Sequence, residues 1–253
     1  MKFKLRLSEA RGFADEGWLK SYHTFSFASY RSNEHMQFGP LRVLNEDQVA
    51  PKNGFPTHPH RNYEIFSYIL AGELTHTDSM GSHEVCRKGS VQFTSAGKGI
   101  QHSEYNRSKG AQCKFLQVWV VPRNMNTTPS YQIAEFTKEQ KLNQLCPMIV
   151  PKEVAQEKLI TVDQDFFAFS SMLEKGHSVT HPLHPKRQVY IHLPITSPDV
   201  SLILKNNQET IELKAGDGCY INSTSSSKDE DLIIEGNSEA LSEFVLFDMI
   251  QYD

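Results

Sequence analysis

Three histidines and one glutamate stand in two short pairs of the sequence. His58 and His60 are separated by one residue, and so are His102 and Glu104, which follow a glycine-rich turn at residues 97–99. Side chains at positions i and i+2 of a β-strand share one face. Two such pairs on neighbouring strands would direct three imidazoles and one carboxylate at a common centre. This mixed nitrogen and oxygen set suits a divalent transition metal such as Fe(II), Mn, Ni or Cu better than Mg or Ca.

An octahedral metal held by four such groups keeps two positions open for a substrate or O2, whereas a structural zinc site is closed. A single His-x-His pair in a strand is ordinarily a surface or core feature, and it is the second pair, His102 with Glu104, that favours a metal site here. Spacing does not identify the acidic ligand. Glu64 lies an even number of residues after His58 and His60, so on one continuous strand its side chain would share their face. Glu64 and Glu104 therefore both remain candidates at this point.

The elements that must position these pairs are short strands. Glycine and asparagine turns separate runs rich in β-branched and aromatic residues, which predicts an all-β sandwich or barrel. Only residues 135–145 and 152–159 have a helical pattern. The predicted strands are 64–70, 90–93, 114–121, 188–193, 200–204 and 244–247.

The two halves of the chain resemble each other. The turn and strand at residues 88–93 match residues 215–220, about 127 positions later, and the same offset carries the strand 115–120 onto 242–247. An offset one residue shorter places His58-Pro59-His60-Arg61 on His184-Pro185-Lys186-Arg187. We therefore predict two similar β-domains, residues 1–133 and 145–253, joined by a helical linker at 134–144.

The second half lacks the metal-binding pattern of the first. Lys186, a cation that repels metals, falls at the position of His60, and the offset puts Asp229 and Asp231 where His102 and Glu104 would recur. We therefore expect a metal in the first domain and none in the second. The remaining histidines of this half are expected in loops or on the surface: His177, His181, His184 and His192.

Composition narrows the class of protein. The 253 residues carry a net charge of −4, and the sequence pI near 6.3 argues against direct binding of nucleic acid. No apolar run reaches the length of a membrane helix, and residues 1–7 lack the apolar core of a secretory signal. The four cysteines are widely spaced, as in proteins of a reducing compartment. We expect a cytoplasmic monomer.

The two histidine segments resemble the paired motifs of the cupins. His58-Pro59-His60-Arg61, together with the stretch from Ser95 to Glu104, is similar in particular to the pirin family. The match covers residues 12–125, and the second half more loosely resembles short bacterial pirin-like proteins that cleave flavonols. Three further segments contribute to the resemblance: Phe25-Ser26-Phe27, residues 38–43 and His76-Thr77-Asp78-Ser79.

This resemblance implies a bicupin with one metal in the N-terminal barrel. The family motif places the ligands on His58, His60, His102 and Glu104, with Glu64 nearby but not ligating. Iron is the typical metal, and Mn, Ni, Co, Cu or Zn could replace it. Gly72 lies one residue later than in other cupins and Ser95 replaces a proline, but both features match pirins.

The implied activity is that of quercetin 2,3-dioxygenase, which opens a flavonol ring with O2 and releases carbon monoxide. Glu104 is then the natural base for the flavonol hydroxyl. Four aromatic residues are candidates either to line the pocket or to fill the core: Phe27, Phe38, Phe55 and Tyr68.

Two other functions stay open at the level of sequence. Mammalian pirins resemble iron-dependent transcriptional co-regulators, which implies a redox-sensing role through a protein partner, in the nucleus of a eukaryotic source. A bicupin that binds a ligand without chemistry is the third alternative.

Overall fold

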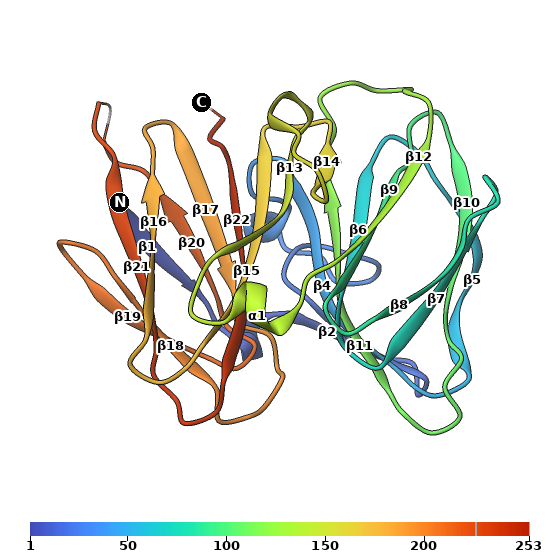
Figure 1. Ribbon diagram of the computed structural model, residues 1–253, viewed down its shortest axis with the longest axis horizontal. Coiled ribbons are helices and arrows are strands. Elements are labelled where there is room, and N and C mark those ends of the chain that lie inside the picture. Colours follow the sequence, from blue (N-terminus) through green and yellow to red (C-terminus); the bar gives the residue numbers. More distant parts are fainter. Residues whose placement is uncertain (226, 253) are drawn as a thin grey trace. The chain divides into compact units, whose positions relative to one another are not determined.

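The computed structural model describes residues 1–225 and 227–252, and nearly all of its regular structure is β (Figure 1). The chain forms two compact units, each built from two antiparallel sheets. We call Arg11–Glu135 with Pro151–Gln164 the N-terminal unit. The C-terminal unit consists of Met1–Ala10, Phe136–Val150 and Asp165–Asp253. The predicted all-β class is confirmed.

The N-terminal unit contains one large and one small sheet. The large sheet has the strand order β12-β9-β6-β11-β4-β3-β2, and the small one β5-β10-β7-β8. The strands of the large sheet are β2 (Gly12–Asp15), β3 (Leu19–His23), β4 (Leu41–Val49), β6 (Glu64–Ala71), β9 (Ser90–Ser95), β11 (Cys113–Val120) and β12 (Ser130–Glu135). Those of the small sheet are β5 (Asn53–His60), β7 (Glu73–Asp78), β8 (His83–Arg87) and β10 (Ile100–Asn106).

The C-terminal unit repeats this arrangement. The strands that it contributes to a seven-stranded sheet lie in the order β1-β20-β17-β22-β15-β13, and its small sheet has the order β16-β21-β18-β19. Its strands in the seven-stranded sheet are β1 (Lys2–Arg6), β13 (Cys146–Pro151), β15 (Phe166–Leu173), β17 (Arg187–His192), β20 (Gly218–Asn222) and β22 (Ser242–Ile250). Those of the small sheet are β16 (Ser178–Leu183), β18 (Ser201–Lys205), β19 (Thr210–Lys214) and β21 (Glu230–Gly236). By sheet order, β5 corresponds to β16 and β10 to β21.

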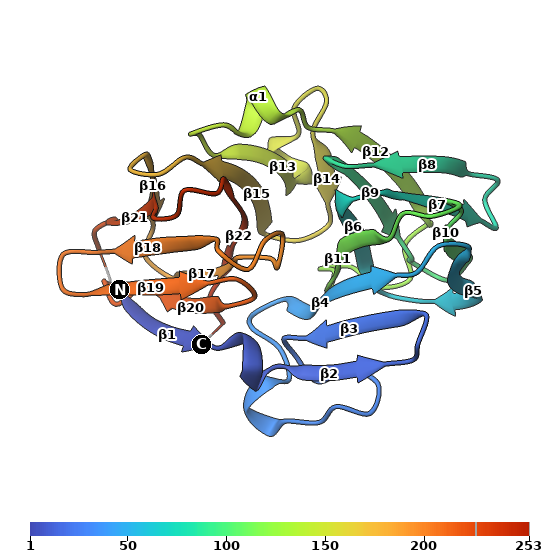
Figure 2. The ribbon, with the colours of Figure 1, turned by 90° about the horizontal axis from the view of Figure 1, so that it is seen from below.

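Two segments join a different unit from the one that their place in the sequence suggests. The N-terminal strand β1 pairs along its whole length with β20 of the C-terminal unit (Figure 2). Residues 151–164, which include β14 (Ile160–Val162), belong to the N-terminal unit, where the Gln132 side chain bonds the backbone N–H and carbonyl of Thr161. The sequence-based division at residues 133 and 145 does not anticipate these two exchanges.

Helical structure is shorter than the sequence pattern suggests. The stretch 135–145 contains only α1 (Lys138–Lys141), which begins at a capping box formed by Thr137 and Gln140. The stretch 152–159 contains only the 3-10 turn Lys152–Val154, and two further 3-10 turns lie at Ser8–Ala10 and Asn33–His35. In the described part of the chain, no helix has the length and apolar character needed to cross a membrane.

Candidate metal centre

The edge strand β5 carries the first histidine pair against β10. His58 lies opposite His102 and His60 opposite Ile100, with an irregularity before Glu104 pairs with Phe55. Prolines at positions 56 and 59 are tolerated because an edge strand has backbone N–H groups that need no partner. Gly54 allows the close approach of the two strands, since a Cβ there would lie 2.2 Å from the Glu104 carbonyl oxygen.

The three predicted histidines lie together. One ring nitrogen from each of His58, His60 and His102 falls within 4.8 Å of the others. The Nε2 atoms of His58 and His102 are 3.2 Å apart, and Nδ1 of His58 donates to the Pro56 carbonyl at 2.7 Å. That hydrogen bond leaves Nε2 of His58 available, and a hydrogen bond from the other ring nitrogen is how proteins orient an imidazole toward a metal.

Burial keeps two of these imidazoles neutral. It lowers the pKa of His60 to about 3, and the neighbouring His102 and His58 lower it further. The pKa of His102 is likewise lowered to about 3, first by burial and then by His58 and His76. Neutral imidazole is the form that binds metals. Both rings are therefore ready to bind a metal ion throughout the neutral pH range.

Glu104 is held by three neutral donors. Its Oε1 accepts hydrogen bonds from Ser67 Oγ, at 3.1 Å, and from the Gln92 side-chain amide, while Oε2 accepts one from Gln117 at 2.9 Å. The side chain is 1% exposed. This network fixes the carboxylate next to His102, since both belong to a second group of atoms within 4.8 Å whose third member is His76.

The sequence assigns no role to His76, which is only one residue of the segment His76-Thr77-Asp78-Ser79. The ring is fully buried, its Nε2 donates to the Asp78 carboxylate at 3.1 Å, and it stacks on Tyr131 with centroids 4.7 Å apart. Its centroid is 5.3 Å from that of His102. Its position one strand away, directly opposite Glu104 in the β7–β10 pairing, is a tertiary relationship that sequence spacing does not reveal.

Glu64 lies outside both metal-binding groups. The chain turns at Asn62, whose φ of 58° lies in the left-handed region, so that β5 ends at His60 and Glu64 begins β6 in the other sheet. The alternation of side chains along one strand therefore does not relate the direction of Glu64 to that of His60. Glu64 Oε1 instead accepts a hydrogen bond from Ser95 at 2.7 Å, and burial raises the pKa of its carboxyl group.

The donor set fits a divalent transition metal. Buried His102 Nδ1 and His76 Nδ1 have no hydrogen-bond partner within the described residues, and two imidazole Nε2 atoms converge within 3.2 Å. A cation would satisfy converging lone pairs that have no proton to share. Imidazole and carboxylate ligands together suit Fe, Mn, Ni, Co, Cu or Zn and leave the choice among them open.

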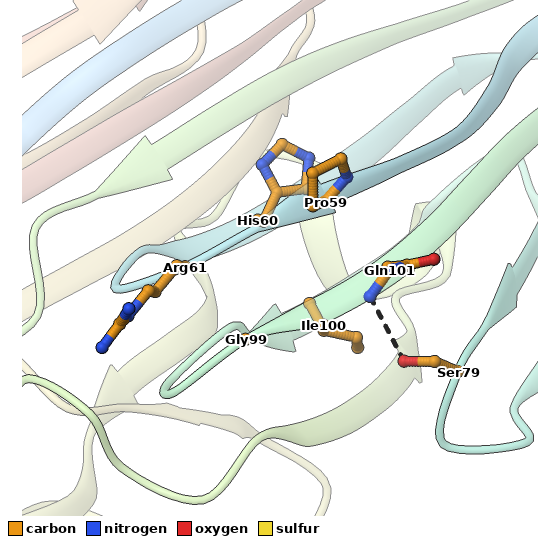
Figure 3. A pocket seen from close by; sticks show the side chains of 7 residues that line it. All are labelled: Pro59, His60, Arg61, Ser79, Gly99, Ile100 and Gln101. Atoms are coloured by element: carbon orange, nitrogen blue, oxygen red, sulfur yellow. Dashed lines mark hydrogen bonds between the residues drawn. The ribbon is translucent and has the colours of Figure 1, made fainter.

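Two hollows of the N-terminal unit meet at His60. A partly open cavity of about 160 Å3 is lined by His58, His60 and Glu104 and by the aromatic rings of Phe27, Phe55 and Trp119. Figure 3 shows the second hollow, an open depression of about 600 Å3 where the end of β5 meets the start of β10. There the Gln101 backbone N–H donates to Ser79 Oγ at 3.2 Å. His60 lines both hollows.

Two family models match the chain. The model described as Pirin covers residues 4–120, and the one described as Quercetinase C-terminal cupin domain covers residues 148–249. The chain is 38% identical over 189 residues to the protein named quercetin 2,3-dioxygenase of Escherichia coli (strain K12), across 75% of this chain and 80% of that relative. This chain belongs to the pirin family. The predicted family and the two-cupin architecture are confirmed.

Solved pirin structures share the whole fold. The crystal structure of YhhW from Escherichia coli superposes with a TM-score of 0.87 at 33% identity, covering 99% of both chains. The bacterial pirin YhhW in complex with nickel(II) gives 0.86 at 32% identity, over 99% of this chain and 100% of that one. That nickel complex and the cluster of histidines and Glu104 support one divalent metal ion in this pirin.

Sequence reasoning missed part of the cavity lining of this pirin. Of the four aromatic candidates, Phe27 and Phe55 line the cavity, whereas Phe38 and Tyr68 do not contribute to it. Trp119 was missed, although it alternates with Gln117 on one face of β11, and a glutamine inside an apolar strand is a detectable signal. Four polar residues of β3 and β4 were also missed: Ser21, His23, Asn45 and Asp47.

The second barrel of this pirin has apolar side chains at the positions of the first barrel's candidate ligands. His181 pairs with Leu232 as His58 pairs with His102, which places Leu183 at the position of His60 and Ile234 at that of Glu104. Leu183, Leu232 and Ile234 belong to the hydrophobic core of this unit. The offset-based positions Lys186, Asp229 and Asp231 are all exposed.

The expectation that all histidines of this half lie in loops or on the surface is wrong for two of them. His181 and His192 lie on β16 and β17, 6% and 0% exposed, whereas His177 and His184 are exposed. His181 Nε2 bonds Asp248 at 2.9 Å, and Arg187 Nε donates to the other oxygen of Asp248 at 2.6 Å. This histidine therefore belongs to a buried ion-pair network.

Proposed function

We propose that this pirin is a metal-dependent dioxygenase that opens the ring of a quercetin-like flavonol with O2 and releases carbon monoxide. The observation that carries the proposal is the convergence of His58, His60 and His102, with the Glu104 carboxylate beside His102, at a partly open, aromatic-lined cavity. The identity of 38% to a relative named quercetin 2,3-dioxygenase supports the substrate class. His58, His60, His102 and Glu104 are the proposed ligands, and Fe(II) is the proposed metal.

The chain's own groups would orient the flavonol and exclude water. Phe27, Phe55 and Trp119 offer faces and edges to a planar ring, and Trp119 and Phe27 already pack edge to face with centroids 5.6 Å apart. When bound, a divalent metal supplies a Lewis acid that polarises the flavonol oxygens.

Glu104 is the proposed acceptor of the proton that leaves the flavonol 3-hydroxyl. Its Oε1 already accepts two hydrogen bonds, from Ser67 and Gln92, whereas Oε2 accepts one, from Gln117. A Glu104→Gln variant that kept its metal and full turnover would contradict this role.

The decisive experiment supplies quercetin and O2 to protein loaded separately with Fe, Mn, Ni, Co or Cu. We expect loss of the flavonol absorbance and release of one carbon monoxide for each flavonol consumed. A His58→Ala variant should lose this activity, and a His83→Ala variant, changed at an exposed histidine of β8, should keep it. Absence of turnover with every metal would contradict the proposal and favour the role of a partner-binding regulator.

A further inference from the structure

Four polar residues on the large sheet line the cavity that contains the metal ligands of the small sheet. Ser21 and His23 lie on β3 at i and i+2, and Asn45 and Asp47 lie on β4 with the same spacing. The register places His23 opposite Asn45 and Ser21 opposite Asp47. The four side chains therefore form a compact patch on one face of the sheet, which we call the polar wall. Each residue is only 2–3% exposed.

Hydrogen bonds within the polar wall fix the direction of its remaining groups. His23 Nδ1 lies 2.9 Å from Asn45 Oδ1 and 3.3 Å from Ser21 Oγ, and Ser21 in turn donates to Asp47 Oδ1. Burial lowers the pKa of His23, so its ring is neutral with the proton on Nδ1, from which it donates to Asn45. His23 Nε2 is consequently a hydrogen-bond acceptor.

Three atoms of the polar wall have no hydrogen-bond partner among the described residues: His23 Nε2, Asn45 Nδ2 and Asp47 Oδ2. Their residues line the cavity together with His58, His60 and Glu104. None of these three atoms is itself fully buried, so each can be reached from the cavity and is open to a hydrogen bond with its contents. The cavity is thus presented with one acceptor, His23 Nε2, one donor, Asn45 Nδ2, and the second oxygen of the Asp47 carboxyl group, which accepts a hydrogen bond when ionised and donates one when protonated.

Asp47 also lacks a cation. The nearby Arg11 is engaged by Glu46, with its Nη2 3.1 Å from Oε2, and no described basic residue forms an ion pair with Asp47. Burial raises the pKa of the Asp47 carboxyl group to about 7. A buried carboxyl group without a charge partner destabilises a fold unless something donates to it. Ser21 donates a hydrogen bond to Oδ1 of this carboxyl group, and a hydroxyl group of a ligand would donate one to Oδ2.

We propose that the polar wall is a recognition subsite for hydroxyl groups of a planar ligand whose other oxygens chelate the metal. The ligand class is a polyhydroxylated aromatic compound, with O–H donors to Asp47 and His23 and an acceptor for Asn45. This inference rests on the proposed function only in taking the metal site as the anchor of the ligand. Asp47 is then a specificity-determining residue that distinguishes hydroxylated from unsubstituted rings.

The volume of the cavity limits the size of the group that it can hold. Its volume of about 160 Å3 is below the 300–1,000 Å3 typical of sites that enclose a whole drug-sized ligand. At about 30 Å3 per water molecule it equals roughly five waters. One hydroxylated ring therefore fits between the proposed metal ligands and the polar wall. The rest of a larger flavonoid would extend out of this cavity.

The test compares two probes that share a chelating 3-hydroxyl and 4-carbonyl pair. Quercetin carries additional ring hydroxyls, and 3-hydroxyflavone carries none. Ni(II)-loaded protein is titrated with each under argon, so that affinity is measured by the absorbance shift without turnover. We expect wild-type protein to bind quercetin at least tenfold more tightly. Asp47→Asn should weaken quercetin binding about tenfold and change 3-hydroxyflavone binding less than twofold.

Two further variants complete the test. Asp15→Asn, which removes the same charge from an exposed position of β2, should leave both affinities unchanged. His23→Phe retains a ring beside Phe27 but lacks Nε2, and it should weaken quercetin binding selectively even if Asp47→Asn fails to fold. Equal wild-type affinities for the two flavonols, or an unchanged ratio in the folded Asp47→Asn variant, would overturn the proposal.

Failure of the subsite and failure of the proposed function give different results. Selective loss of quercetin binding without any carbon monoxide release in air would support the polar wall and contradict the dioxygenase. Turnover without a preference between the two flavonols would support the dioxygenase and overturn the polar wall. If neither flavonol binds to the metal-loaded protein, both proposals are wrong.

Discussion

His58 and His102 face each other across the β5–β10 pair with their Nε2 atoms 3.2 Å apart. The Pro56 carbonyl accepts a hydrogen bond from Nδ1 of His58, which leaves Nε2 directed at His102. Backbone pairing and this carbonyl hold two of the four proposed metal ligands in place. The β-sheet register therefore does the positioning that a flexible loop could not.

Removal of either ligand from this pair should abolish tight metal binding. We expect His58→Ala and His102→Ala to reduce Ni(II) affinity at least 100-fold, because each loses one of four ligands. Calorimetric titration of metal-free protein, together with metal analysis after dialysis, checks the result. His83→Ala provides the control, since this imidazole is exposed and bonds Thr77 at 2.9 Å. An affinity within tenfold of the wild-type value in the His102 variant would remove this residue from the ligand set.

The amides that hold Glu104 should also affect metal affinity. Gln92 donates to Oε1 and Gln117 to Oε2, and loss of such outer contacts typically costs 10- to 100-fold in affinity. We expect Gln92→Met, which keeps the volume and removes the amide, to bind Ni(II) 10- to 100-fold more weakly while remaining folded. Unchanged affinity in the folded variant would mean that Glu104 needs no support from Gln92.

His76 tests the boundary of the ligand set. Its Nε2 atom is engaged with Asp78, which should keep this ring behind the ligands rather than among them. His76→Gln retains a side chain that can bond Asp78, and we expect it to weaken Ni(II) binding less than tenfold. A loss as large as that of His102→Ala would place His76 among the ligands instead.

The parts of the site that sequence could predict are those confined to one strand. Alternation along residues 58–60 and 102–104 correctly groups each pair, because side-chain direction repeats every two residues within a strand. The same rule fails for Glu64, since the left-handed residue Asn62 ends one strand before the next begins. Two-residue alternation predicts side-chain direction only within one strand and not across such a turn.

Relationships between strands were beyond the reach of sequence spacing. The polar wall requires β3 and β4 to pair in one register, and β1 joins a sheet whose other strands lie more than 100 residues later. His181 was expected in a loop or on the surface because the spacing of the histidines in this half fits no single strand face, and its buried partner Asp248 lies 67 residues away. These contacts depend on long-range pairing, which a single sequence does not specify by any local pattern.

The buried network of the second barrel should contribute stability and not metal binding. His181→Leu would leave one oxygen of buried Asp248 without its partner, at a cost of about 1–3 kcal/mol. We expect a lower thermal midpoint and an unchanged content of one Ni(II) for each chain. If the metal content of the folded variant fell, His181 would be part of a second site.

The Asp47 carboxyl group should make the metal-free protein less stable as the pH rises. Burial raises its pKa in the folded state to about 7, above the ordinary value near 4 in an unfolded chain. The folded protein therefore holds a proton that the unfolded chain releases between these values, so this stabilisation is complete below pH 4 and is lost as the pH rises through 7. Asn at this position cannot lose a proton, and it still offers Ser21 an acceptor oxygen.

We therefore expect Asp47→Asn to be more stable than wild type at pH 8, by up to about 4 kcal/mol, and to have no such advantage at pH 4. Chemical unfolding of both metal-free proteins between pH 4 and pH 8 measures the difference in their free energies of unfolding. The titrations of all other groups, which the two proteins share, cancel in this difference. Asp15→Asn should show no trend, because its parent carboxylate is exposed. A difference that does not change with pH would show that Asp47 has the same pKa in the folded and unfolded states, against the proposed effect of burial. A variant that gains stability at pH 8 while it loses affinity for quercetin would show that Asp47 is retained for binding at the expense of the fold.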